Sequence, residues 1–427
     1  MREPLYRQRP VEPNPASFDS ARRINDFIVQ CEAFSNCYLL QTEQGDIQVN
    51  AGMGIEAPVI RHNFAAFSDA PLRYLVLTQG HVDHVGGVAH FREHNPGMQV
   101  IAQAGNPEHQ AYDARLAPFR ADRSAFAFTP KFAAAFGHYA EHGYTEFPPQ
   151  DTPRPDILFQ DRHSLSLGGL EVELIAVPGA ETNDSLVLWL PQQRICLTGN
   201  LFGCAFGHFP NLVTIRGDRY RDALTVAAAV QTVLDLAPDT LLYGHHGPIH
   251  GAALIREELT VLRDAIHHVH DATVRGMNAG ADVHSLMRDI ALPAELEVGQ
   301  GYGKVAWSVR AIFEHYAGWF HHASTTELYA TPRSAVHADL VELAGGADTI
   351  TQRARDRLGA GDYLEALHLL DIVLSVNPGD SAAAQVAAAA HETLLEQSDN
   401  FWLSAWLRHR LEALRGGAAQ DAPAGAG

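Results

Sequence analysis

The stretch that most constrains the fold is residues 75–87, where an apolar run is followed at once by potential metal ligands. The run has the character of a buried strand, and His81, Asp83 and His84 arrive within four positions. Two glycines and a helix-like sequence come next. Imidazole and carboxylate groups on a turn after a strand are typical of metal sites, and glycine permits close backbone approach. We therefore expect an α/β domain with a metal site on this turn.

Two further loops of the same kind follow strand-like runs. The first contains Pro178-Gly-Ala-Glu181, and the second contains Gly244 followed by His245 and His246. Adjacent side chains point in different directions, so at most one of the two histidines is expected to bind a given metal. Three such loops in one α/β domain reinforce one another as parts of a single site.

The order of predicted elements separates an α/β part from a helical part. Up to residue 243, short β-type runs alternate with helices, which favours sheets covered by helices. Residues 107–145 have few turn signals and are predicted to be a helical insertion, and after residue 252 only helices are expected. Residues 358–371 resemble one tetratricopeptide-type hairpin. The predicted divisions are an N-terminal arm (1–20), a metal-binding domain (21–270), a helical domain (271–415) and a disordered tail (416–427).

Composition narrows the classes of partner. The net charge of −19 argues against nucleic acid or an anionic membrane surface, although it does not exclude an anionic small-molecule substrate. There is no apolar run of transmembrane or signal-peptide length. The four cysteines form no CxxC pair and no disulfide framework, so we expect reduced thiols and a cytoplasmic location.

Taken together, these motifs resemble the metallo-β-lactamase fold superfamily, and within it the alkylsulfatase branch. The signature Thr-His-x-His-x-Asp-His is matched around His81, and Pro-Gly-Thr-Glu by residues 178–181. Other family stretches are matched by residues 211–217, 244–248, 301–303 and 316–320. The resemblance implies an αββα sandwich, then an all-α dimerisation domain with tetratricopeptide-like hairpins, and a homodimer or higher homo-oligomer. The family's sterol-carrier-like domain has no counterpart after residue 415, which implies a smaller or less extended substrate than a long alkyl sulfate.

The resemblance also implies a ligand set, from which this chain departs twice. Site one would be Gln79, His81 and Glu181, and site two would be Asp83, His84 and one histidine of the 245–246 pair. Gln79 stands where the family has its first histidine. Asn200 stands where the family has a bridging acid. An amide is a weaker donor than imidazole, and a lost carboxylate no longer offsets repulsion between two cations. One metal in site two, a pair held by oxygen donors, and an inactive site all remain open.

The implied activity is a metal-dependent hydrolase that acts through a metal-activated water, with Asp83 and His81 as catalytic residues. Zn²⁺ is the expected metal, as one or two ions, with Mn²⁺ or Fe as alternatives. The substrate would be a sulfate ester, or a related ester or ether, of a small organic molecule. Arg216 and Asn211 would bind it. The sequence agrees equally well with Arg216 being a surface arginine beside acidic residues. The alternatives are a non-catalytic subunit and an iron-dependent redox enzyme.

Overall fold

The computed structural model describes residues 12–420, with side chains described as far as residue 416. The chain divides after Tyr316 into two compact units. The predicted boundary after residue 270 falls inside helix α6 (Ala252–Asn278), which belongs to the first unit. The predicted arm is described from residue 12, and within it the Ala16 amide donates to buried Glu56. Residues 1–11 of that arm lie outside the described residues.

The first unit contains two sheets. One has the strand order β1-β2-β3-β4-β5-β6-β7, antiparallel as far as β4 and parallel from there. The other has the order β13-β12-β11-β10-β9-β8, in which only the β11–β12 pair is parallel. The strands are β1 (Arg22–Arg23), β2 (Ile28–Cys31), β3 (Cys37–Thr42), β4 (Gly45–Val49), β5 (Leu72–Val76), β6 (Gln99–Gln103), β7 (Ile157–Phe159), β8 (Arg162–Leu167), β9 (Leu170–Ala176), β10 (Leu186–Leu190), β11 (Ile195–Gly199), β12 (Thr240–Tyr243) and β13 (Ile249–His250).

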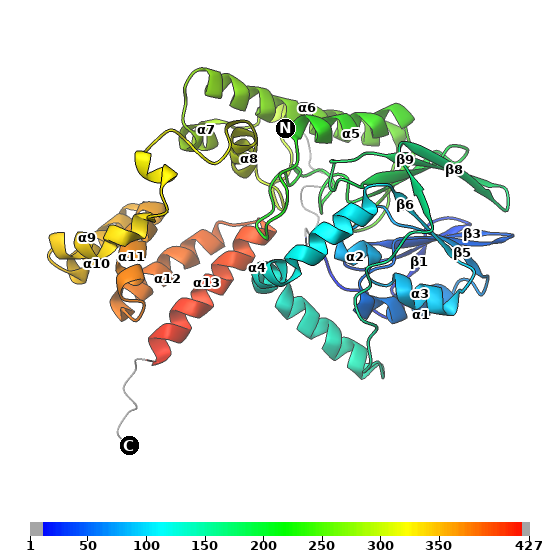
Figure 1. Ribbon diagram of the computed structural model, residues 1–427, viewed down its shortest axis with the longest axis horizontal. Helices are drawn as coiled ribbons and strands as arrows, with labels where there is room; N and C mark the ends of the chain where they lie inside the picture. Colours follow the sequence, from blue (N-terminus) through cyan, green and yellow to red (C-terminus); the bar gives the residue numbers. More distant parts are fainter. Residues whose placement is uncertain (1–11, 421–427) are drawn as a thin grey trace. The chain divides into compact units, whose positions relative to one another are not determined.

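Helices cover the outer face of each sheet, which confirms the αββα sandwich (Figure 1). Successive strand residues serve different layers: Leu75 packs under the helices beside the first sheet, and Val76 packs between the sheets. This alternation explains why the central strands read as continuous apolar runs. The helices of the first unit are α1 (Ala57–Ala65), α2 (Val82–Val85), α3 (Val88–His94), α4 (Asn106–Glu141), α5 (Ala223–Leu236), α6, α7 (Val283–Asp289) and α8 (Val305–Ala317), with short 3₁₀ turns at Gly54–Glu56 and Ala294–Leu296.

The second unit is helical. It contains α9 (His337–Leu343), α10 (Ala347–Ala360), α11 (Tyr363–Val376), α12 (Ser381–Glu396) and α13 (Phe401–Gln420), with 3₁₀ turns at Thr325–Leu328 and Arg333–Val336. Helices α10 and α11 form the predicted hairpin and share a core with α12. The predicted disordered tail is helical as far as Gln420, and residues 421–427 lie outside the described residues.

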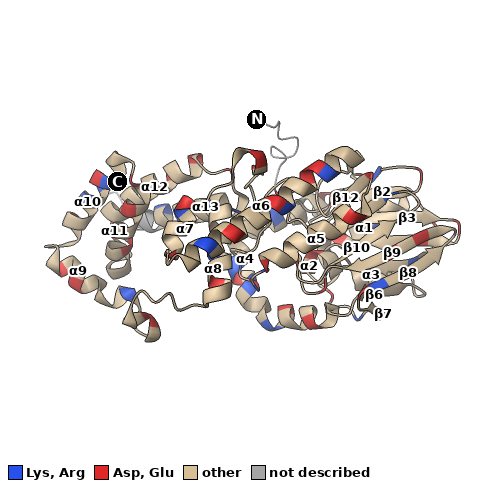
Figure 2. Ribbon diagram, turned by 90° about the horizontal axis from the view of Figure 1, so that it is seen from above, with Lys and Arg blue, Asp and Glu red and all other residues tan. Residues whose placement is uncertain are grey.

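Basic and acidic residues are interspersed along the helices, as Figure 2 shows. Within residues 12–420, no helix is both long enough and apolar enough to cross a membrane. All four cysteines are buried. The cytoplasmic location stays a prediction.

Candidate active site

A cavity of about 410 Å³ opens in the first unit beside the loops that follow β5, β9, β11 and β12. Most of the predicted site residues line it: His81, Asp83, Glu181, Asn200, Arg216 and His245. Gln79 and His84 are buried and contact these residues. His246 and Asn211 are not among the lining residues. The structure therefore brings the three predicted loops together.

His84 is held so that one ring nitrogen faces the other site residues. The amide of Thr78 donates to Asn50 Oδ1, and the Thr78 hydroxyl does the same at 2.9 Å. Thr78 Oγ1 therefore accepts from His84 Nδ1, which lies at 3.0 Å. This assigns the tautomer with a lone pair on Nε2, which lies 3.7 Å from an Asp83 oxygen. A neutral imidazole fixed in this way is a typical metal ligand.

Gln79 lies between two imidazoles. Its Nε2 is 2.9 Å from His81 Nδ1 and 3.1 Å from His84 Nε2. In this orientation the amide donates hydrogen bonds to both rings. The side chain thus links the two histidines directly.

His81 faces two different environments. Its Nδ1 lies near Gln79 and 4.0 Å from Glu181 Oε1. Its Nε2 lies 3.4 Å from Asp218 Oδ2 and 3.3 Å from Arg216 Nη2. Because Gln79 donates to Nδ1, the neutral ring carries its proton on Nε2 and donates it to Asp218.

Glu181 is paired with a buried arginine. Arg221 Nη2 lies 2.9 Å from Glu181 Oε1, and Arg221 Nε donates to the Glu181 carbonyl at 2.7 Å. Arg221 also donates to the Asn211 carbonyl, so Asn211 supports this arginine through its backbone. Burial raises the pKa of Glu181 to about 7, although Arg221 and Arg216 act in the opposite direction.

The last predicted loop separates His245 from His246. His246 has a left-handed backbone (φ +61°), and its carbonyl accepts from Gln30 and Asn36. His245 lines the cavity instead. Asn200 lies against the preceding glycine, since a Cβ on Gly244 would meet Asn200 Oδ1 at 1.7 Å. The loop therefore needs glycine at 244 to seat Asn200 beside the histidines.

Protonation states in the cavity suit cation binding. Burial lowers the pKa of His81 and of His245 to about 3, and it also lowers the pKa of His84. Burial acts to raise the pKa of Asp83, but the nearby histidines and Arg216 bring it below its usual value. The site thus offers neutral imidazoles and an ionised carboxylate at neutral pH.

Two unpartnered atoms test the fit of a metal. His245 Nδ1 and Asn200 Oδ1 are buried and have no hydrogen-bond partner among residues 12–420. They accompany Asp83 and His84, whose Nε2 faces the amide nitrogens of Gln79 and Asn200 and would exchange those contacts for a metal. Together these residue types suit one divalent cation. The predicted site-one ligands are already engaged: Gln79 with His81, and Glu181 with Arg221.

Several residues of the cavity were not predicted. Asp218, which lies beside the cavity, was not among the predicted site residues, yet it and Arg216 both contact His81, so Arg216 is not a surface arginine. Arg120, from the insertion helix α4, binds Asp218 at 2.9 Å. No local pattern signals a contact across 98 positions. An apolar wall, also missed, includes Phe34, Val82, Ala117, Phe128 and Phe132.

His208 packs against the Gly299–Gly301 segment. Its Nδ1 accepts from the Gly301 amide at 3.0 Å, and a Cβ on Gly299 would collide with its ring. This contact fixes the segment that brings Tyr302 to the cavity.

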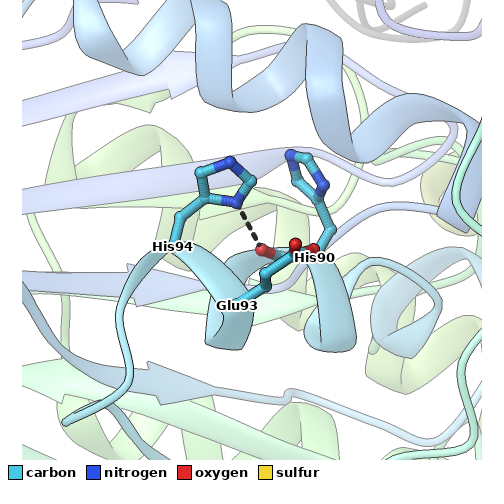
Figure 3. Close-up of side chains that lie close together, drawn as sticks. All are labelled: His90, Glu93 and His94. Atoms are coloured by element: carbon cyan, nitrogen blue, oxygen red, sulfur yellow. Dashed lines mark hydrogen bonds between the residues drawn. The ribbon is translucent and has the colours of Figure 1, made fainter.

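A second group of possible ligands lies on α3, away from the cavity. His90, Glu93 and His94 have ligand atoms within 4.8 Å of one another (Figure 3). His94 Nδ1 is hydrogen-bonded to the His90 carbonyl, and Arg61 Nε lies 3.3 Å from His90 Nε2. The group is partly exposed and a cation already lies beside it, so we assign no function to it.

Comparisons with known proteins agree with this architecture. A model of the metallo-beta-lactamase superfamily matches residues 32–245, and one of alkyl sulfatase dimerisation matches residues 283–417. The linear primary-alkylsulfatase of a Pseudomonas species is 28% identical over 395 residues, which cover 88% of this chain and 73% of that protein. The alkyl/aryl-sulfatase BDS1 of Saccharomyces cerevisiae is 26% identical, over 81% of this chain and 56% of its own length.

Solved structures support the fold. The stereoselective inverting sec-alkylsulfatase Pisa1 from Pseudomonas superposes with a TM-score of 0.81 at 21% identity, covering 93% of this chain and 66% of that one. The superfamily match spans half of the sequence and includes the cavity-lining residues from Phe34 to His245. The chain belongs to the metallo-beta-lactamase superfamily and carries an alkyl sulfatase dimerisation region.

Proposed function

We propose that this protein is a metal-dependent hydrolase of sulfate esters, which converts an organic sulfate and water into an alcohol and hydrogen sulfate. The observation that carries the proposal is the composition of one cavity. Metal-type donors, the half-buried Arg216 and an apolar wall all line it. A sulfate ester with an apolar organic group matches these three parts. The alkylsulfatases among its relatives support the same substrate class.

We propose one bound Zn²⁺ ion, with Mn²⁺ or Fe²⁺ as the other candidates. Asp83, His84 and His245 would hold it, and Asn200 would add its amide oxygen. The unpartnered atoms of His245 and Asn200 support this choice. When bound, such an ion lowers the pKa of a water molecule toward ~7 and polarises the substrate.

Other residues would bind and orient the substrate. The guanidinium of Arg216 provides a planar fork suited to a sulfate group. Residues of the apolar wall would hold the organic group and exclude water. Glu181, with a pKa of about 7, lines the cavity and is suited to exchange a proton with the departing alcohol. Asn211 would act through its carbonyl contact with Arg221 and not on the substrate.

We also propose that the protein forms a homodimer through its helical unit. The match to the dimerisation model supports this assembly. Val336, Leu340 and Leu343 recur at helical spacing on and before α9, and their exposed fractions are 51%, 41% and 84%. Such an apolar stripe on a surface helix favours burial against a partner.

The test is release of inorganic sulfate from short and long n-alkyl sulfates, with the matching alkyl acetates in parallel. Protein stripped of metal is reloaded with Zn²⁺, Mn²⁺ or Fe²⁺ before the assay. We expect sulfate release only after metal loading, and its loss in Arg216→Met but not in the exposed-arginine control Arg115→Met. Metal binding without sulfate release would contradict the proposal and favour a non-catalytic subunit. Oxygen consumption with iron would favour a redox enzyme.

A further inference from the structure

The insertion helix α4 holds the turn that carries Arg216. Arg123 Nη2 donates to the Ile215 carbonyl at 2.9 Å, and its Nε donates to the Arg216 carbonyl at 3.2 Å. One turn earlier on the same helix, Arg120 Nη2 lies 2.9 Å from Asp218 Oδ1. The backbone and the side chains of the turn are therefore both bound to α4.

The turn directs two opposite charges to the same ring. Gly217 has a left-handed backbone (φ +86°), and its amide donates to the Thr214 carbonyl at 3.0 Å. On either side of it, Arg216 and Asp218 both reach Nε2 of His81. Arg216 Nη2 and Asp218 Oδ2 lie 3.9 Å apart.

The two oxygens of Asp218 have different partners. Oδ1 is bound by Arg120, and Oδ2 accepts the Nε2 proton of His81. The side chains of Asp218 and Arg120 are 6% and 12% exposed, so water competes little for these contacts. A carboxylate that accepts from one imidazole nitrogen fixes both the tautomer and the ring plane. Asp113, which also binds Arg120, holds the guanidinium from its other side.

We propose that Arg120 and Asp218 are positioning residues, through which α4 orients Arg216 and the ring of His81 toward the sulfate group of the substrate. The inference rests on the proposed function, because it assigns Arg216 to that group. It adds a role for α4 that goes beyond forming the apolar wall. Displacing a binding group by about 1 Å can cost on the order of 100-fold in rate.

Asp218→Asn distinguishes positioning from simple electrostatics. Removing a negative charge beside Arg216 would strengthen anion binding if charge alone mattered. Positioning predicts the opposite, a rise of roughly 10-fold or more in the dissociation constant of inorganic sulfate. Arg120→Met should give a similar loss, and Arg120→Lys should recover part of it. The double variant should be no worse than the weaker-binding single variant, because both act through one chain of contacts.

The experiment is calorimetric titration of metal-loaded full-length protein with inorganic sulfate, followed by KM and kcat for an alkyl sulfate. Arg115→Met and Asp122→Asn, at exposed positions of α4, are the controls and should bind sulfate as the unaltered protein does. Tighter or unchanged sulfate binding in Asp218→Asn, with kcat unchanged, overturns the inference while the proposed function stands. Weakened binding in a protein that hydrolyses no sulfate ester supports the inference and removes the proposed function. If Asp218→Asn does not fold, sulfate binding is measured in Arg120→Lys and Arg123→Met. Weaker binding supports the inference, and unchanged or tighter binding in both variants overturns it.

Discussion

Arg221 and Arg219 offer a matched comparison of a buried and an exposed ion pair. Arg221 and Glu181 have side chains that are 6% and 12% exposed, and they lie 2.9 Å apart. Arg219 and Glu108 are 48% and 49% exposed, at 2.6 Å. Removing one partner of a buried pair typically costs about 3–5 kcal/mol, because the other charge stays buried. Exposed pairs contribute about 0.2–1 kcal/mol. Arg221→Met should therefore destabilise the protein severalfold more than Arg219→Met.

The loss in Arg221→Met should depend on pH. Burial already raises the pKa of Glu181 to about 7, and Arg221 is the main group that opposes this rise. Without Arg221 the folded pKa rises further above the unfolded value of 4.5, so the folded state binds a proton more readily. The contribution of Glu181 to stability then falls as pH increases from 4.5 through the folded pKa. The destabilisation should be larger at about pH 8 than at about pH 6.

Urea unfolding of the metal-free variants at both pH values measures the loss in free energy of unfolding. This loss is the change in the urea concentration at the midpoint, multiplied by the slope of free energy against urea concentration. Equal losses in Arg221→Met and Arg219→Met would refute the reasoning. So would a loss in Arg221→Met that does not change with pH.

Three further predictions concern other parts of the chain. Gln79→His should raise the bound metal from one to two equivalents, because the side chain lies between His81 and His84. Elemental analysis measures this change, and an unchanged metal content would place residue 79 outside the metal site. Burial raises the pKa of Glu56 to about 7, so the free energy of unfolding should decrease from pH 4.5 to 7, and Glu56→Gln should reduce that slope while the part due to Glu181 remains; a slope as steep as that of the unaltered protein would contradict this origin. Leu343→Glu should shift the mass in light scattering to that of a monomer, whereas Asp339→Asn on the same helix should not; a Leu343→Glu dimer would exclude this face.

The sequence reveals elements whose pattern is local. Strands such as β10 are buried on both faces, which requires an unbroken apolar run, and such runs are the β-type runs that the sequence shows before residue 243. Strand β8 was missed because its residues alternate between exposed and half-buried, and its apolar side is short. The two-residue strands β1 and β13 carry no pattern at all.

Some residues of the candidate site can likewise be predicted from local sequence, and others cannot. His81, Asp83 and His84 follow a strand and were predicted directly, and Glu181 and His245 follow the same logic on their own loops. The roles of other residues depend on long-range contacts. Asp218 acquires its role only because Arg120, far away in the sequence, folds against it.

The orientations of Gln79 and of the two adjacent histidines also needed the structure. The left-handed backbone of His246 decides which histidine lines the cavity, and a single residue type does not specify that conformation. Asn211 was expected to bind substrate, but its carbonyl accepts a hydrogen bond from Arg221 and it does not line the cavity.

The most direct test of the account is sulfate release from an alkyl sulfate, measured against the amount of metal loaded and repeated with Asp83→Ala. We expect sulfate release to rise with loading up to about one ion per chain, and Asp83→Ala to lose both metal and activity. Metal-loaded protein that releases no sulfate from any alkyl sulfate, or an Asp83→Ala variant that retains activity, would contradict it.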